Sequence, residues 1–458
     1  MNERNNKLEL LGSAPIPKAL MALGIPIMIG MLINALYNLV DAYFVGGLGE
    51  SQMGAISIVF PLGQVVVGLG LMFGNGAASY LSRLLGRGDK DAANRVASTA
   101  LYSSILIGAI IILFSAIFLK PILVMLGATE TIMLYALSYA RIYVLSCIFN
   151  VFNVTMNNIV SSEGAAKTTM CALLLGAVLN IGLDPLFIYT FDMGVAGAAI
   201  ATAISQMVST VVYLAYVFRK KSAFSFSVKA FSPTGQMMAE ILKIGIPTLV
   251  FQFLTSLSIA LINRASVDYG DSVIAGMGAV TRITSMGTLV VFGFLKGFQP
   301  IAGFSYGAKK FDRLREAIKT SIIWSTSFCL VVGLVMAVFS TQIISQFTEG
   351  DYQMILAGQK SLFANGLTFV LFGFYTVYPS LFLAMGKGAA GFFLGACRQG
   401  ICFVPVILLL PAVWGMNGIL YAQPIADIIS AVITVFMALY VHRELSVAEK
   451  QVMPNSEM

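Results

Sequence analysis

The chain has 458 residues, of which 58% are hydrophobic and only 11% are charged, and its mean hydropathy is +0.87. A soluble domain carries about 25% charged residues, so this composition excludes a soluble enzyme and indicates a protein that crosses the bilayer many times. The net charge of +7 does not call for nucleic acid as a partner, because Lys and Arg gather in the cytoplasmic loops of membrane proteins.

Residues 1–17 are polar and contain no short apolar region followed by a cleavage site, so they are predicted to form a cytoplasmic segment rather than a signal peptide. Twelve segments then follow that are long and apolar enough to cross a bilayer, which takes about 20 residues. They span residues 18–45, 53–81, 93–118, 133–159, 168–190, 194–218, 238–263, 275–303, 316–343, 355–383, 389–412 and 416–441. The predicted fold class is therefore an all-α, multi-pass membrane protein.

Basic residues alternate between the two sides of the predicted membrane. The loops on one side hold Arg83, Arg87, Lys90, Arg95, Lys167, Arg219, Lys220, Lys221, Lys229, Lys309, Lys310, Arg313, Arg315 and Lys387. The opposite loops hold little beyond Lys120 and Arg264. By the positive-inside rule, both termini, the linker of residues 219–237 and the tail of residues 442–458 are predicted to be cytoplasmic.

The chain repeats itself at an offset of 221 residues. The first helix begins with Gly24-Ile25-Pro26 and the seventh with Gly245-Ile246-Pro247, and Gly194, Gly197, Ala201, Ile204 and Ser209 match Gly415, Gly418, Ala422, Ile425 and Ser430. Each half starts on the cytoplasmic side, so each holds an even number of helices, and six fits. The repeat predicts two parallel lobes, residues 18–218 and 238–441, an organisation typical of transporters that bind substrate between the repeats.

Four polar residues of the first half fall at a similar depth in the outer part of the membrane when residues are counted along their helices: Asp41, Asn180, Asp184 and Thr202. Ionisable residues within the membrane are functional candidates. Their oxygen atoms suit a hard cation such as Na⁺, and paired carboxyl groups equally suit protons. The alternative is that Asp184 caps its helix or pairs with Arg141.

The repeat provides a control for these four residues. The matching positions in the second half are Ile262, Ile401, Pro405 and Gln423, so the acidic set is confined to one lobe. A requirement of folding alone would apply to both related halves, and the asymmetry therefore favours a functional role.

Further polar residues recur at helical spacing and predict either contacts between helices or the wall of a wet cavity. They are Asn34, Tyr37 and Asn38 on the first helix and Asn150, Asn153 and Asn157 on the fourth. In the second half, Arg398 and Asp427 are expected to form a buried pair, and contact with a substrate is left open. Lys296 is expected to extend its charge to the cytoplasmic surface.

Taken with Asp41, the stretches "LNIGLDPLFI" at 179–188 and "GVAGAAIATAISQ" at 194–206 resemble the MATE (multidrug and toxic compound extrusion) transporters. The stretch "MGKGAAGFFLGACRQGICFVP" at 385–405 resembles the MepA-like bacterial branch of this family. The resemblance implies a V-shaped pair of six-helix lobes that exports bulky, often cationic organic compounds in exchange for H⁺ or Na⁺.

The same resemblance implies that Asp41, Asn180, Asp184 and Thr202 form the cation or proton site and that Pro26 marks a bend in the first helix. The expected partners are small drug-like molecules and the lipid bilayer, and the expected location is the bacterial cytoplasmic membrane, with the protein acting as a monomer. No cofactor, structural metal or enzymatic activity is expected, because the five cysteines lack metal-ligand spacing and His442 is the single histidine. A lipid-linked precursor flippase of related fold is the alternative function.

Overall fold

A computed structural model describes residues 2–348 and 351–452, and within this part of the chain it contains helices and no strands. Twelve helical segments among these residues are long and apolar enough to cross a membrane. They consist of α2 (Ile16–Gly46), α3 (Glu50–Arg87), α4 (Lys90–Met125), α5 (Glu130–Ser162), α6 (Ala166–Pro185) with η1 (Leu186–Thr190), α7 (Gly194–Phe218), α8 (Gly235–Ser266) with η3 (Val267–Tyr269), α9 (Asp271–Gly307), α10 (Phe311–Val338), α12 (Tyr352–Tyr375) with α13 (Val377–Ala384), α14 (Gly388–Ala396) with η4 (Cys397–Ile401) and α15 (Phe403–Trp414), and α17 (Ala422–Val452). Short helices α1 (Asn2–Gly12), η2 (Val228–Ala230), α11 (Ser340–Ser345) and α16 (Met416–Leu420) join or flank them.

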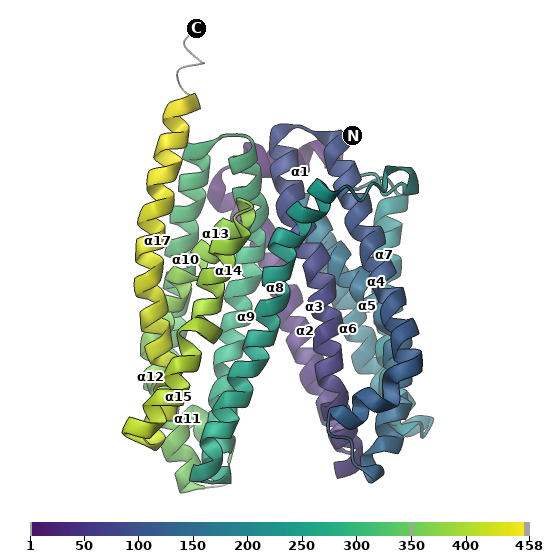
Figure 1. Ribbon diagram of the computed structural model, residues 1–458, viewed down its shortest axis with the longest axis vertical. Coiled ribbons are helices and arrows are strands. Elements are labelled where there is room, and N and C mark those ends of the chain that lie inside the picture. Colours follow the sequence, from purple (N-terminus) through teal and green to yellow (C-terminus); the bar gives the residue numbers. More distant parts are fainter. Residues whose placement is uncertain (1, 349–350, 453–458) are drawn as a thin grey trace.

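The helices form two lobes of six membrane segments, so the predicted fold is confirmed. The lobes meet at the end of the molecule where α1 and the C-terminal end of α17 lie, and they diverge toward the opposite end, which gives the molecule the shape of a V (Figure 1). Helices α2 to α7 form the first lobe, and helices α8 to α17 form the second.

The two lobes are related by the 221-residue repeat, and the helix packing shows this directly. In the repeat, α2 corresponds to α8 and α3 corresponds to α9. Helix α2 packs against α9 and α3 packs against α8, so each of these contacts is the counterpart of the other. The same exchange holds between residues: a Cβ atom at Gly86 would collide with the carbonyl oxygen of Phe304, and one at Gly307 would collide with that of Arg83. Each glycine thus lets two backbones touch where the lobes cross.

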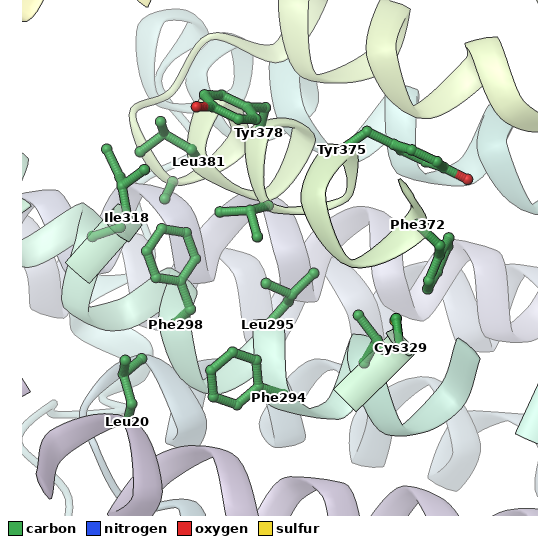
Figure 2. Packing of buried hydrophobic residues seen from close by; sticks show 14 of the residues in the cluster. Leu20, Phe294, Leu295, Phe298, Ile318, Cys329, Phe372, Tyr375, Tyr378 and Leu381 are labelled. Carbon is green, nitrogen blue, oxygen red and sulfur yellow. The ribbon is translucent and has the colours of Figure 1, made fainter. Parts of the chain in front are cut away.

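A large apolar cluster joins the two lobes at the end where α1 lies. In Figure 2, Leu20 of α2 lies beside Phe294 and Phe298 of α9, while Leu381 of α13 approaches from the other side. Leu20, Phe298 and Leu381 are fully buried. Because this cluster contains residues of both lobes, it stabilises the arrangement in which the lobes touch at this end.

Two features of the helices differ from the sequence-based prediction. Residues 2–12 form helix α1, which buries Leu11 in the apolar cluster and is also held by polar contacts with the second lobe. Arg313 donates from Nε to the carbonyl oxygen of Leu11 at 3.2 Å, and Lys310 donates from Nζ to that of Gly12 at 2.9 Å. The last helix continues to Val452, beyond the predicted end at residue 441. Both segments are rich in polar residues and carry few apolar ones, so hydropathy does not mark them as helices.

The junction of α5 and α6 binds the linker between the lobes through Glu163. This side chain is 1% exposed and accepts hydrogen bonds from the backbone N–H of Ala223, from Ser222 and from the hydroxyl of Tyr216. Burial raises the pKa of the Glu163 carboxyl above its usual range despite these donors. A carboxyl group that the sequence did not single out therefore fixes the start of the linker.

Candidate functional site

The predicted acidic set is assembled from three helices of the first lobe. Asn180 of α6 donates from Nδ2 to Asp184 Oδ1, one helical turn along, at 3.3 Å and contacts Thr202 Oγ1 of α7 at 3.4 Å. Asp41 of α2 is close enough to Asp184 for the two carboxyl groups to interact. Asp184 and Asn180 are 0% and 1% exposed. The structure thus brings all four predicted residues together.

Three oxygen atoms of this set are buried without a hydrogen-bond partner in the part of the chain that the structure describes: Asp41 Oδ1, Asn180 Oδ1 and Asp184 Oδ2. A buried acceptor without a partner costs about 1–3 kcal/mol. Two adjacent carboxylates add a mutual repulsion, which either a shared proton or a bound cation relieves. The residues therefore fit a site for H⁺ or a hard monovalent cation.

A cavity of about 770 Å³ lies between the lobes. Its wall contains Asp41, Asn180 and Thr202 of the acidic set, while Asp184 lies behind them. Of the other residues predicted to line a cavity, the wall contains Asn34, Tyr37, Asn38, Asn150, Asn153, Asn157 and Arg398. Asp427 is 2% exposed and does not reach the wall, because Arg398 stands between it and the cavity.

Arg398 and Asp427 form the expected buried pair in the second lobe. Arg398 Nε donates to Asp427 Oδ1 at 3.1 Å, and the guanidinium carbon lies 4.6 Å from the centre of the Phe372 ring. Tyr375 and Gln423 donate to the same carboxylate oxygen, at 3.1 and 2.9 Å. Arg398 lies in a short π-helical segment, η4, a local widening that is frequent at functional sites.

Arg141 does not pair with Asp184, so the alternative account of this acid through an ion pair is wrong. Arg141 is solvent- or lipid-exposed on α5, and the ion pairs among the described residues do not include it. Asp184 also does not cap a helix end, because the helical backbone continues through η1 to Thr190.

The amide residues of α5 combine the two predicted roles. Asn153 donates to Gln206 Oε1 and to the Gln206 carbonyl oxygen, both at 2.8 Å, and accepts from Thr210 at 2.9 Å. Asn157 donates to the Tyr213 hydroxyl at 3.3 Å. These bonds join α5 to α7, and the same side chains also reach the cavity wall.

Pro26 lies within α2 and is buried, and the helix is continuous from Ile16 to Gly46. A proline in a helix interior removes one backbone hydrogen bond and weakens the helix locally. Pro26 is on the same helix as Asp41, so the helix that carries part of the acidic set also carries a point at which it bends easily.

Lys296 of α9 is a residue that the sequence placed wrongly. Its ammonium does not extend to the cytoplasmic surface but lines the cavity, where Nζ donates to Asn158 Oδ1 at 3.1 Å. Lys296 lies eleven residues before the end of α9 at Gly307, a depth of about 16 Å. A lysine side chain is much shorter than this depth. The number of residues between Lys296 and the end of the helix therefore already indicated that its charge does not reach the cytoplasmic surface.

The family model described as MatE matches residues 26–186 and 247–409. The two matches begin at Pro26 and Pro247, the offset of the internal repeat. The multidrug export protein MepA of Staphylococcus aureus (strain MSSA476) is 30% identical over 447 residues, 97% of this chain and 98% of that protein.

Solved structures agree with this match. One described as the outward-facing conformation of a multidrug resistance MATE family transporter of the MOP superfamily has a TM-score of 0.89 at 27% identity, covering 96% of this chain and 98% of that chain. A MATE structure described as being in the straight conformation has a TM-score of 0.90 at 27% identity, covering 97% and 99%. The chain therefore belongs to the MATE family of membrane transporters, in which it is MepA-like.

Proposed function

We propose that the protein is a secondary active multidrug efflux transporter that exports bulky, often cationic organic compounds in exchange for H⁺ or Na⁺. The observation that carries this proposal is the acidic set of Asp41, Asn180, Asp184 and Thr202, which adjoins the large cavity between the lobes. A cavity with buried carboxyl groups at one wall attracts organic cations, and it binds H⁺ or Na⁺ at the same place.

The cavity itself suits large and varied substrates. Its volume of about 770 Å³ falls in the range of about 300–1,000 Å³ found for drug-sized ligands. The wall combines aromatic rings, such as Phe60 and Phe251, with amides, such as Gln64 and Asn75. Aromatic and amide walls accept many shapes of amphipathic molecule, in keeping with the multidrug export ascribed to the relative MepA.

The proposed coupling works through the charge of the acidic set. When H⁺ or Na⁺ binds to Asp41 and Asp184, the negative charge that holds an organic cation is neutralised and the substrate is released. Helix α2 then bends near Pro26, which changes the wall of the cavity. The ion and the substrate compete for the same carboxyl groups in the first lobe. Binding of one therefore releases the other, so the two cross the membrane in opposite directions, which is antiport.

The proposed orientation follows from the basic loops. Helix α1 and the C-terminal end of α17 lie at the end where the lobes touch (Figure 1), and the positive-inside rule assigns this end to the cytoplasm. The lobes then diverge toward the outside, in keeping with the outward-facing relative. We place the protein in the cytoplasmic membrane of a bacterium, where it acts as a monomer.

A direct test replaces Asp184 with Asn, which keeps the shape of the side chain and removes its charge. We expect ethidium efflux from cells to fall to that of cells without the transporter. The matched control is Asp192→Asn, in the exposed turn after η1, where the backbone φ of 52° is one that Asn also adopts. Undiminished efflux by the Asp184 variant would refute the proposal.

The coupling ion needs a second measurement. The purified protein is reconstituted into liposomes that are loaded with ethidium. An inward gradient of H⁺ is imposed in one experiment and an inward gradient of Na⁺ in another. The proposal expects one of these gradients to drive ethidium movement in the wild type and neither to drive it in the Asp184→Asn variant. Ethidium movement that follows neither gradient would remove the antiport mechanism.

A further inference from the structure

We propose that Lys296 is an anion-binding residue of the central cavity, through which the cavity also binds compounds that carry a carboxylate beside their cationic group. This inference deepens the proposed function and rests on it. The acidic set then holds the cationic group of such a substrate, and Lys296, on the other lobe, holds its carboxylate.

The charge of Lys296 is not neutralised by a protein carboxylate. Its Nζ atom donates to the neutral amide oxygen of Asn158 at 3.1 Å, and none of the ion pairs among the described residues involves it. Arg398, the other cation of the cavity wall, is held by Asp427 at 3.1 Å. A buried ammonium with only an amide partner retains strong affinity for an anion.

The surroundings of Lys296 add a second donor. Gln299 lies three residues further along α9, and both side chains line the cavity. Residues three apart share one face of a helix, so the amide NH₂ of Gln299 and the ammonium of Lys296 face the same space. An ammonium and an amide together offer charge-assisted and neutral hydrogen bonds to the two oxygens of a carboxylate.

The two charged groups lie at different depths. Lys296 is eleven residues from the end of α9 at Gly307, and Asp184 is eighteen residues from the start of α6 at Ala166. With a rise of 1.5 Å per residue, their depths differ by about 10 Å. Along the membrane normal, the negative region and the positive region are therefore about a nanometre apart, a difference in depth that an elongated zwitterion spans.

The test compares two fluorescent dyes that differ in one group. Tetramethylrhodamine carries a cationic xanthene and a free carboxylate, whereas in its methyl ester the carboxylate is masked. Binding of each dye to the purified full-length protein in detergent is measured by fluorescence polarisation at neutral pH. For Lys296→Gln we expect carboxylate-dye affinity to fall about tenfold or more, while the ester binds at least as tightly because a repelling charge is removed.

Binding of the ester also reports that the variant is folded, and Lys296→Arg is the matched control, because a guanidinium binds carboxylates as well. Equal losses for both dyes in Lys296→Gln, or an unchanged affinity for the carboxylate dye, would overturn the role of Lys296 and leave the proposed function standing. If the wild type bound neither dye, both proposals would fall. Restored discrimination between the dyes in Lys296→Arg would support the electrostatic origin.

Discussion

The two lobes share one fold but treat their buried carboxyl groups in opposite ways. In the first lobe, Asp184 accepts one hydrogen bond at Oδ1, from Asn180, and its Oδ2 has no partner among the described residues. In the second lobe, Asp427 Oδ1 accepts from Arg398, Tyr375 and Gln423. A buried carboxylate with several hydrogen-bond donors stabilises a fixed arrangement. A buried carboxyl group with an oxygen that lacks a donor readily binds and releases a cation.

The repeat makes this comparison sharper. Thr202 and Gln423 occupy matching positions, and each joins the polar network of its own lobe, Thr202 through Asn180 and Gln423 through Asp427. Asp184, by contrast, matches Pro405, which has no polar side chain. The related halves thus keep a polar position in common but assemble different sites around it, one suited to an ion and one to structure.

The largest expected effect is a difference in protein stability between variants of Asp427 and variants of Asp184. Replacing Asp427 with Asn leaves Arg398 buried without a counter-charge, which costs about 3–5 kcal/mol. Replacing Asp184 with Asn removes an under-satisfied buried carboxylate and is expected to leave stability unchanged or higher. The measurement is the thermal unfolding of both purified variants in the same detergent, beside the wild type.

A double variant tests whether the second-lobe pair acts as a unit. Arg398→Met combined with Asp427→Leu removes both charges, and buried pairs replaced together by apolar residues lose little stability. We expect the double variant to be more stable than Asp427→Asn alone. If Asp184→Asn unfolded as easily as Asp427→Asn, the distinction between the two lobes would be wrong.

The second prediction concerns the two equivalent contacts between the lobes, those of Gly86 and Gly307. Gly86→Ala and Gly307→Ala each place a methyl group against a carbonyl oxygen of the other lobe, and overpacking of this kind costs about 1–3 kcal/mol. Because the contacts exchange under the repeat, the two variants should weaken the closed end equally. The measurement is the labelling rate of a cysteine introduced at Phe304 or Arg83, which separation of the lobes would raise.

Gly278→Ala is the matched control for these variants. Gly278 lies within α9, and no atom lies close to the position of an added Cβ. Alanine is the better helix former by about 1 kcal/mol, so this change should leave labelling unchanged or slow it. Labelling that rose only in one of Gly86→Ala and Gly307→Ala would show that the lobes are not equivalent at their crossing.

The sequence sufficed for the helices, the repeat and the acidic set, and the reason is physical. A bilayer imposes a length of about 20 apolar residues on each helix, and the fixed rise per residue converts sequence position into depth. Counting along helices that run in known directions therefore places Asp41 and Asp184 at one level, where the structure brings their carboxyl groups together.

The features that the sequence missed depend on direction or on distant partners. Lys296 lies eleven residues before the end of α9, but only the arrangement of the two lobes shows that a cavity reaches it at that depth. Helix α1 is held by Arg313, about 300 residues away along the chain. Glu163 is a single acid in a short loop, and its role depends on the linker that folds back onto it.

The smallest expected effect concerns Glu163, which resembles Asp427 in having several donors but lies outside the membrane helices. Burial raises the pKa of its carboxyl in the folded protein above the ordinary value of 4.5. As pH rises through that ordinary value, the unfolded chain loses its proton first, so the folded state binds more protons. The free energy of unfolding should therefore fall with rising pH, by at most about 1.4 kcal/mol per pH unit.

This fall begins near the ordinary pKa and ends once the pH exceeds the raised pKa of the folded protein, above which both states are ionised. Glu163→Gln cannot ionise, so the difference in unfolding temperature between wild type and variant should change across this window and become constant above it. The glutamine oxygen still accepts hydrogen bonds from Ser222 and Ala223, as the carboxyl does, whereas its NH₂ replaces the oxygen that accepts from Tyr216, a change that does not depend on pH in this range. A difference that stayed constant from about pH 5 to pH 8 would show that the positive charge of Lys7 and the hydrogen-bond donors offset the cost of burying the charge.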